Sequence, residues 1–110
     1  MQISSRRLDQ ITIFDVIGDI DLANSPQVRK ALLQEVRENR TPRVVMNLSK
    51  VRYIDSSGVA SLVEGLKACR DLGLRFVLFG LSPSAREVLQ LSRLLKIFEV
   101  YENEDQALAP

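Results

Sequence analysis

The sequence predicts an α/β protein with a single domain, in which helices cross a mixed β-sheet of four or five strands. Two observations predict this class. Short runs of apolar and β-branched residues alternate with longer amphipathic segments, and Pro or Gly separates most of them. The length of 110 residues, 45% of them hydrophobic, suits one modest core and leaves no room for a second, so we assign residues 1–110 to one domain.

The first third of the chain is predicted to form a β-hairpin followed by a helix. The hairpin strands are residues 2–7 and 11–18, joined by a short polar turn. The helix should begin at Ser25, whose hydroxyl can cap it, because Pro26 suits the first helical position. It should end near Asn39.

The rest of the chain is predicted to contain two strand-helix-strand crossovers. Cys69 falls on the apolar face of the first crossover helix, among residues spaced by three and four, and should belong to the core. The first crossover is a strand at 43–48 leading into a turn at 47–50, a helix that ends before Gly73, and a strand at 74–79. The second continues with a helix from Ser82-Pro83 through Leu91 and a short edge strand or its approach at 97–101. A brief helix at 104–108 follows.

Composition argues against several classes of function. The formal charge is +1, and the chain has no long basic run and few aromatic residues, so nucleic acid is not an expected partner. It contains no histidine and one cysteine, which removes the usual general base and an internal disulfide. No apolar run approaches the roughly 20 residues that span a bilayer. We therefore expect a cytoplasmic protein without direct membrane insertion.

The most informative stretch is the corner at 53–59, where a strand turns into a helix. It places an acid, two hydroxyls and a glycine together as Asp55, Ser56, Ser57 and Gly58. Either serine can cap the helix, and Asp55 suits the positive end of the helix dipole. The corner should lie at the carboxyl end of a strand, where open α/β sheets usually carry functional loops.

Catalysis and metal binding are poorly supported at this corner. A nucleophilic serine needs a base within reach, and no glycine-rich phosphate loop is present. Four aspartates, Asp15, Asp19, Asp21 and Asp55, could in principle gather around a divalent cation, although ordinary loop roles explain them as well. We therefore expect no catalytic residue, no bound metal and no cofactor.

The remaining hypothesis is that Ser56 is acted upon. A phosphate on its hydroxyl would sit at a helix N-terminus, where the free N–H groups and the dipole tolerate negative charge. The same phosphate would place charge beside Asp55 on a surface that a partner contacts. The corner could then act as a switch without refolding. The alternative for Ser56 is a simple helix cap.

Five landmarks in one order give the chain a strong resemblance to the STAS domain family, named for sulfate transporters and anti-sigma factor antagonists. The resemblance covers nearly all 110 residues. Gly-Asp-Ile-Asp at 18–21 is similar to the family's Gly-Glu-Leu-Asp, with Asp19 in place of the glutamate. The other landmarks are the central strand at 45–48, the phosphorylation loop at 54–58, and the two parts of the last strand-helix passage at 79–83 and 91–98.

The resemblance implies an anti-sigma factor antagonist, in which a serine kinase that is itself the anti-sigma factor phosphorylates the hydroxyl residue after the aspartate. That residue is Ser56 here. The unphosphorylated form would bind the kinase and release a sigma factor, and a cognate phosphatase would restore it. ATP and magnesium would belong to the kinase. The residues implied in partner binding are Asp19, Asp21, Asn24, Ser25, Asp55, Ser57 and Gly58.

A second branch of the family remains open as an alternative. There, a cytoplasmic STAS subunit docks on the ATPase of an ABC transporter that moves phospholipids. That branch often has threonine and alanine where this chain has Ser56 and Ser57. The two serines favour the antagonist.

Overall fold

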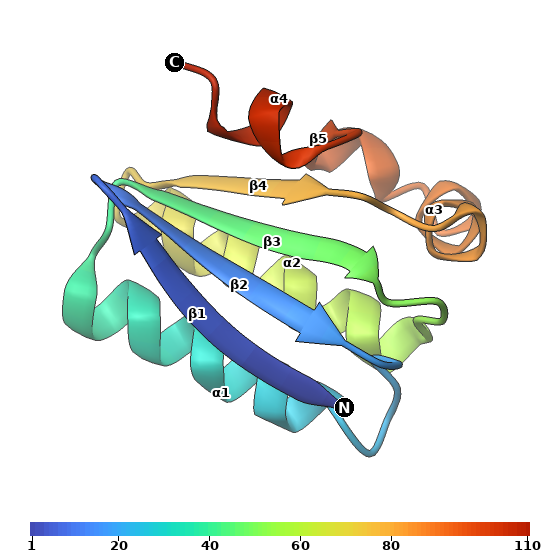
Figure 1. The fold of residues 1–110 in the computed structure, drawn as a ribbon. Helices are drawn as coiled ribbons and strands as arrows, with labels where there is room; N and C mark the ends of the chain where they lie inside the picture. Colours follow the sequence, from blue (N-terminus) through green and yellow to red (C-terminus); the bar gives the residue numbers. More distant parts are fainter.

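A computed structural model describes all residues from 1 to 110 and shows a mixed five-stranded sheet (Figure 1). The strands lie side by side in their order along the chain. The first pair is antiparallel, and the remaining pairs are parallel. The strands are β1 (Gln2–Leu8), β2 (Ile11–Ile17), β3 (Arg43–Lys50), β4 (Arg75–Phe79) and β5 (Glu99–Tyr101). The structure therefore confirms the predicted α/β class and has the larger of the two predicted strand numbers.

Four α-helices accompany the sheet. Figure 1 shows α1 (Ser25–Gln34) and α2 (Ser56–Asp71) running along the same face of the sheet, while α3 (Pro83–Leu91) stands near the carboxyl ends of the strands. The short helix α4 (Glu104–Leu108) packs on the opposite face, where its Ala107 is fully buried. A 3-10 turn at Leu95–Ile97 connects α3 to β5.

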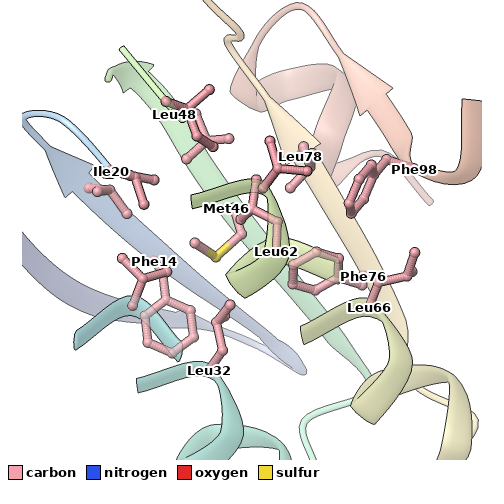
Figure 2. Packing of buried hydrophobic residues seen from close by; sticks show 14 of the residues in the cluster. Phe14, Ile20, Leu32, Met46, Leu48, Leu62, Leu66, Phe76, Leu78 and Phe98 are labelled. Atoms are coloured by element: carbon pink, nitrogen blue, oxygen red, sulfur yellow. The ribbon is translucent and has the colours of Figure 1, made fainter. Parts of the chain in front are cut away.

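Alternate residues of the central strands serve two cores, because helices cover both faces. Phe14 of β2, Met46 of β3 and Phe76 of β4 belong to one core cluster with Leu32 of α1 and Leu62 of α2 (Figure 2). Their neighbours on the other face form a smaller cluster under α4. Both faces of β3 are thus buried, which explains why its sequence is one continuous apolar run.

One predicted boundary was wrong. The turn predicted at 47–50 is strand, since β3 continues to Lys50, which pairs with Ile17. Asn47 stays in the ladder because its side-chain amide donates to Asp15 on the neighbouring strand, at 2.7 Å. The first helix does reach Asn39 as predicted, but its last five residues, Glu35–Asn39, form a π-helical turn.

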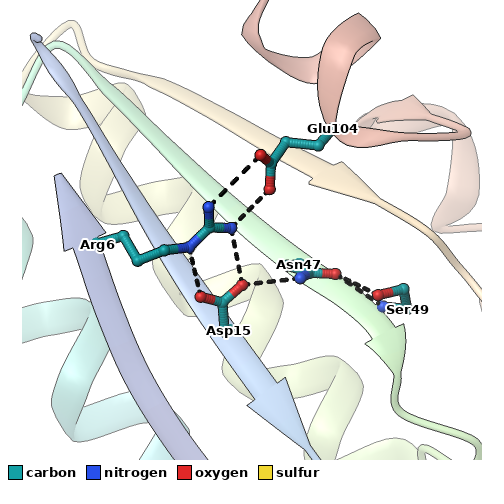
Figure 3. A network of polar contacts seen from close by, with 5 residues as sticks. All are labelled: Arg6, Asp15, Asn47, Ser49 and Glu104. Carbon is teal, nitrogen blue, oxygen red and sulfur yellow. Dashed lines mark hydrogen bonds and ion pairs between the residues drawn. The ribbon is translucent and has the colours of Figure 1, made fainter. Parts of the chain in front are cut away.

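A charged network ties α4 to the outer face of the sheet (Figure 3). The Arg6 guanidinium donates to both carboxylate oxygens of Asp15, at 2.6 and 3.0 Å, and to Glu104 of α4 at 2.6 Å. The hydrogen bonds that Asp15 accepts, chiefly from Arg6 and next from Asn47, hold the pKa of its carboxyl below the usual range. This network should therefore weaken in acid.

We expect part of the acid sensitivity of the fold to depend on Asp15. A carboxyl whose pKa is lower in the folded than in the unfolded chain stabilises the fold above the unfolded pKa of about 4, and this stabilisation is lost as the pH falls below it. Urea unfolding between about pH 6 and about pH 3 should show a shallower loss of unfolding free energy in Asp15→Asn than in the wild type. Equal slopes for the two proteins would contradict the role of this network.

Candidate functional site

Two loops meet at the carboxyl edge of the sheet and build the site. One follows β2 and the other follows β3. Ile20 and Ile54 form a parallel bridge between them, in which the Ile20 N–H donates to the Tyr53 carbonyl at 3.1 Å and the Asp55 N–H donates to the Ile20 carbonyl at 3.3 Å. Both isoleucine side chains are buried in the main core. The two motifs that sequence placed at one edge are thus physically joined.

Asp55 fastens this junction with its two carboxylate oxygens. Oδ1 accepts from the Gly58 N–H and Oδ2 accepts from the Leu22 N–H, each at 3.0 Å. The prediction that Ser56 or Ser57 caps α2 was therefore wrong. Asp55 has the extended backbone of an N-cap, with φ −104° and ψ −174°, whereas both serines already lie in the first helical turn.

Gly58 allows α2 to start directly against the other loop. A Cβ atom added there would lie 2.4 Å from the Ile20 carbonyl oxygen and 2.5 Å from Cγ1 of Ile54. No side chain fits in that space. Gly58 is buried, so it contributes to the site by close packing beneath the surface.

The loop after β2 holds the acidic residues predicted to bind a partner. Asp19 is exposed, and its carbonyl accepts from the Asn24 side-chain amide at 3.2 Å. The Asp21 carboxylate accepts from the Asn24 N–H at 3.1 Å, while its carbonyl accepts from the Ser25 N–H at 2.8 Å. Asp19, Asp21 and Asn24 also line a shallow polar groove with Lys50 and Arg52. These three predicted residues are thus gathered at one surface.

Ser25 does not have its predicted role as a cap. The N-cap of α1 is Asn24, without a side-chain cap, and Ser25 is the first helical residue with only 8% of its surface exposed. Asp21 replaces the cap, because its carbonyl and carboxylate take the first free N–H groups of this turn. Ser25 therefore offers little surface to a partner.

The two serines face two different grooves on the sides of α2. Ser56 is exposed and Ser57 is half-buried. The α2–α3 groove is mostly apolar and is lined by Ser56, Val59, Ala60, Val63, Val88, Ser92 and Leu94. The α1–α2 groove is more polar and is lined by Leu22, Ser25, Pro26, Arg29, Ser57, Ala60, Ser61 and Glu64. Ala60 belongs to both, so the grooves meet within about one turn of Ser56.

The four aspartates considered as a cation site do not come together. Asp15 lies in the Arg6 network on the outer face of the sheet, and the Asp55 carboxylate is engaged with two backbone N–H groups. No group of three or more His, Cys, Asp or Glu side chains is placed to hold a metal ion. None of the helices is both long and apolar enough to cross a membrane.

Sequence reasoning missed the apolar part of this surface. Leu22 is 74% exposed although its N–H is fixed by Asp55, and Val88 and Leu94 bring α3 and the turn after it to the groove beside Ser56. The sequence held one sign that Leu22 is exposed. Leu22 follows the two acidic residues of the motif at 18–21, precedes the predicted helix start, and belongs to no amphipathic pattern. The contribution of α3 depends on tertiary packing and had no local signal.

The fold and the site therefore define a small α/β domain that presents an exposed serine at the start of a helix, beside an acid and between two grooves. The STAS domain family model matches residues 2–107. The chain belongs to the STAS domain family, as its motifs predicted.

Several relatives of this chain are named anti-sigma factor antagonists. The chain is 35% identical over 101 residues to the anti-sigma-B factor antagonist of Listeria monocytogenes, which covers 91% of this chain and 86% of the relative. The crystal structure of an anti-sigma factor antagonist from Mycobacterium paratuberculosis matches with a TM-score of 0.85 and 25% identity, over 97% of this chain and 90% of that one. The phosphorylated form of SpoIIAA, a Bacillus cell fate determinant, shares the fold with a TM-score of 0.75 and 19% identity, over 97% of this chain and 96% of that one.

Proposed function

We propose that this protein is an anti-sigma factor antagonist in a phosphorylation-controlled partner switch. Unphosphorylated, it binds an anti-sigma factor serine kinase and so releases a sigma factor. The observation that carries the proposal is the placement of Ser56, exposed at the first position of α2 and at one end of the apolar α2–α3 groove. The name of the Listeria relative supports the antagonist role.

The position of Ser56 fits a residue that is modified. A phosphate there would lie at the N-terminus of a 16-residue helix, where the helix dipole favours negative charge. The cap and the loop bridge use Asp55 and backbone groups, so neither depends on the Ser56 hydroxyl. Phosphorylation can therefore change the surface while the fold stays in place.

The neighbours of Ser56 explain how a phosphate would release the partner. An apolar side chain of the kinase would enter the α2–α3 groove in the unphosphorylated complex. A phosphate at the end of that groove would have to be desolvated when the partner docks, and it would add charge beside Asp55. Both effects weaken binding.

The remaining components belong to the partners. The kinase would supply ATP and magnesium, and a cognate phosphatase would regenerate the free serine. The chain itself would act in the cytoplasm as a binding protein without catalysis, using Asp19, Asp21, Asn24, Asp55 and Ser57 around the acceptor. Gly58 and Ser25 would support this surface from below.

A pull-down from native lysate tests the proposal, with wild type, Ser56→Asp and Ser5→Asp as baits read by mass spectrometry. Ser5 is exposed on β1 and lines neither groove, so the wild type and Ser5→Asp should both retain a serine kinase, with phosphate on Ser56 after ATP is added. Ser56→Asp should bind that purified kinase at least about tenfold more weakly, which is about 1.4 kcal/mol. An ABC ATPase retained by all three baits, with no phosphate, would contradict the proposal and support the transporter alternative.

A further inference from the structure

An ion pair bridges α1 and α2 at the rim of the site. The Arg29 guanidinium donates to the Glu64 carboxylate across 35 positions of sequence. Both side chains are about half exposed to water, at 55% for Arg29 and 45% for Glu64. They form opposite walls of the α1–α2 groove, the arginine on the α1 side and the glutamate on the α2 side.

The fold has little need for this pair. Buried side chains such as Val28, Leu32 and Leu62, each fully buried, already hold the two helices together. An exposed pair between flexible side chains is screened by water and adds little to stability. The two paired charges are exposed, so they can also interact with the charges of a partner.

The groove that Arg29 and Glu64 line is continuous with the proposed docking surface. Ser57 lies in it directly after the acceptor Ser56, and Ala60 connects it to the α2–α3 groove. Leu22, 74% exposed, offers an apolar contact in the same groove. A partner that covers both grooves beside Ser56 would come close to both charges.

We propose that Arg29 and Glu64 determine which kinase this protein binds. The partner would place an apolar side chain on Leu22, with a carboxylate toward Arg29 and a cationic side chain toward Glu64. Charges at the rim of an interface mainly set the association rate and discriminate between partners. The proposal rests on the proposed function, and it adds the charge order that the partner must carry.

Reversing the pair tests this charge order. The double variant Arg29→Glu with Glu64→Arg keeps the net charge and can form the same intramolecular pair, so its thermal midpoint should match the wild type. Its association rate with the purified kinase recovered on the wild type should fall at least about tenfold at low salt, and the difference should shrink at high salt. The association rate of the neutral double variant Arg29→Gln with Glu64→Gln should lie between those of the wild type and the reversed variant. This neutral variant serves as a second test if the reversed pair folds poorly.

The outcomes separate the two proposals. A reversed variant that binds the kinase as fast and as tightly as the wild type would overturn the charge assignment and leave the antagonist role standing. A wild-type chain that binds no serine kinase would overturn the proposed function and this inference together. A rate loss that persists unchanged at high salt would also contradict an electrostatic role.

Discussion

Replacing Gly58 by alanine is expected to lower the unfolding free energy by about 2–4 kcal/mol. The added Cβ would lie 2.4 Å from the Ile20 carbonyl oxygen, far inside normal contact distance. That carbonyl belongs to the Ile20–Ile54 bridge and cannot move without breaking it. Alanine stabilises a helix relative to glycine by only about 1 kcal/mol, so the steric clash should outweigh this gain and the variant should be less stable. Urea denaturation followed by circular dichroism measures the difference.

Gly65 provides a matched control on the same helix. Its added Cβ would meet the end of the Leu32 side chain at 2.8 Å and the Phe76 ring at 3.2 Å. Side-chain ends can shift more easily than a bridged backbone carbonyl, so Gly65→Ala should cost less than Gly58→Ala. Equal losses in the two variants would contradict the special packing at the start of α2.

Replacing Asp55 by alanine is expected to lower the unfolding free energy by about 1–2 kcal/mol. The variant loses the helix cap at Gly58 and leaves the Leu22 N–H without its protein partner. The exposed Leu22 N–H can turn to water, which limits the cost to roughly that of the cap. Chemical denaturation checks the magnitude. An unchanged midpoint would show that the carboxylate does not fasten the corner.

Asp55→Asn separates the two tasks of this carboxylate. Asparagine is about as good an N-cap as aspartate, so most of the stability should remain. Its amide nitrogen cannot accept a hydrogen bond, so the bond from the Leu22 N–H should be lost. Hydrogen exchange at the Leu22 amide should therefore become faster in Asp55→Asn, while exchange at Gly58 stays slow. Fast exchange at both amides would contradict this division.

The elements of the fold could be predicted because their signals are local. The apolar run of β3 reflects burial on both faces. The helix start predicted at Ser82-Pro83 was confirmed, and there the Ser82 hydroxyl accepts from the Ala85 N–H at 3.1 Å. The β3 boundary failed because Asn47 and Lys50 favour turns by themselves, while pairing with Asp15 and Ile17 holds them in the strand. Tertiary contacts overrode local preference there.

The structure brings most of the predicted site residues to one edge of the sheet, but some of their structural roles differ from the prediction. Sequence placed Asp55 and Ser56 at one helix start and gave the cap to one of the two serines, whereas the extended backbone of Asp55 makes that residue the N-cap. The role of Gly58 depends on a carbonyl 38 positions earlier in the chain, at Ile20. The groove beside Ser56 needs α3, which no local pattern connects to α2.

Phosphate on Ser56 should control partner binding, and a comparison of the phosphorylated and unphosphorylated chain tests this. The purified chain is phosphorylated by the kinase recovered from its native lysate, the site is mapped by mass spectrometry, and the affinities of both forms for that kinase are compared by calorimetry. We expect a single phosphate on Ser56 and at least about tenfold weaker binding of the phosphorylated form. Phosphate on another residue, or equal affinity of the two forms, would contradict the switch.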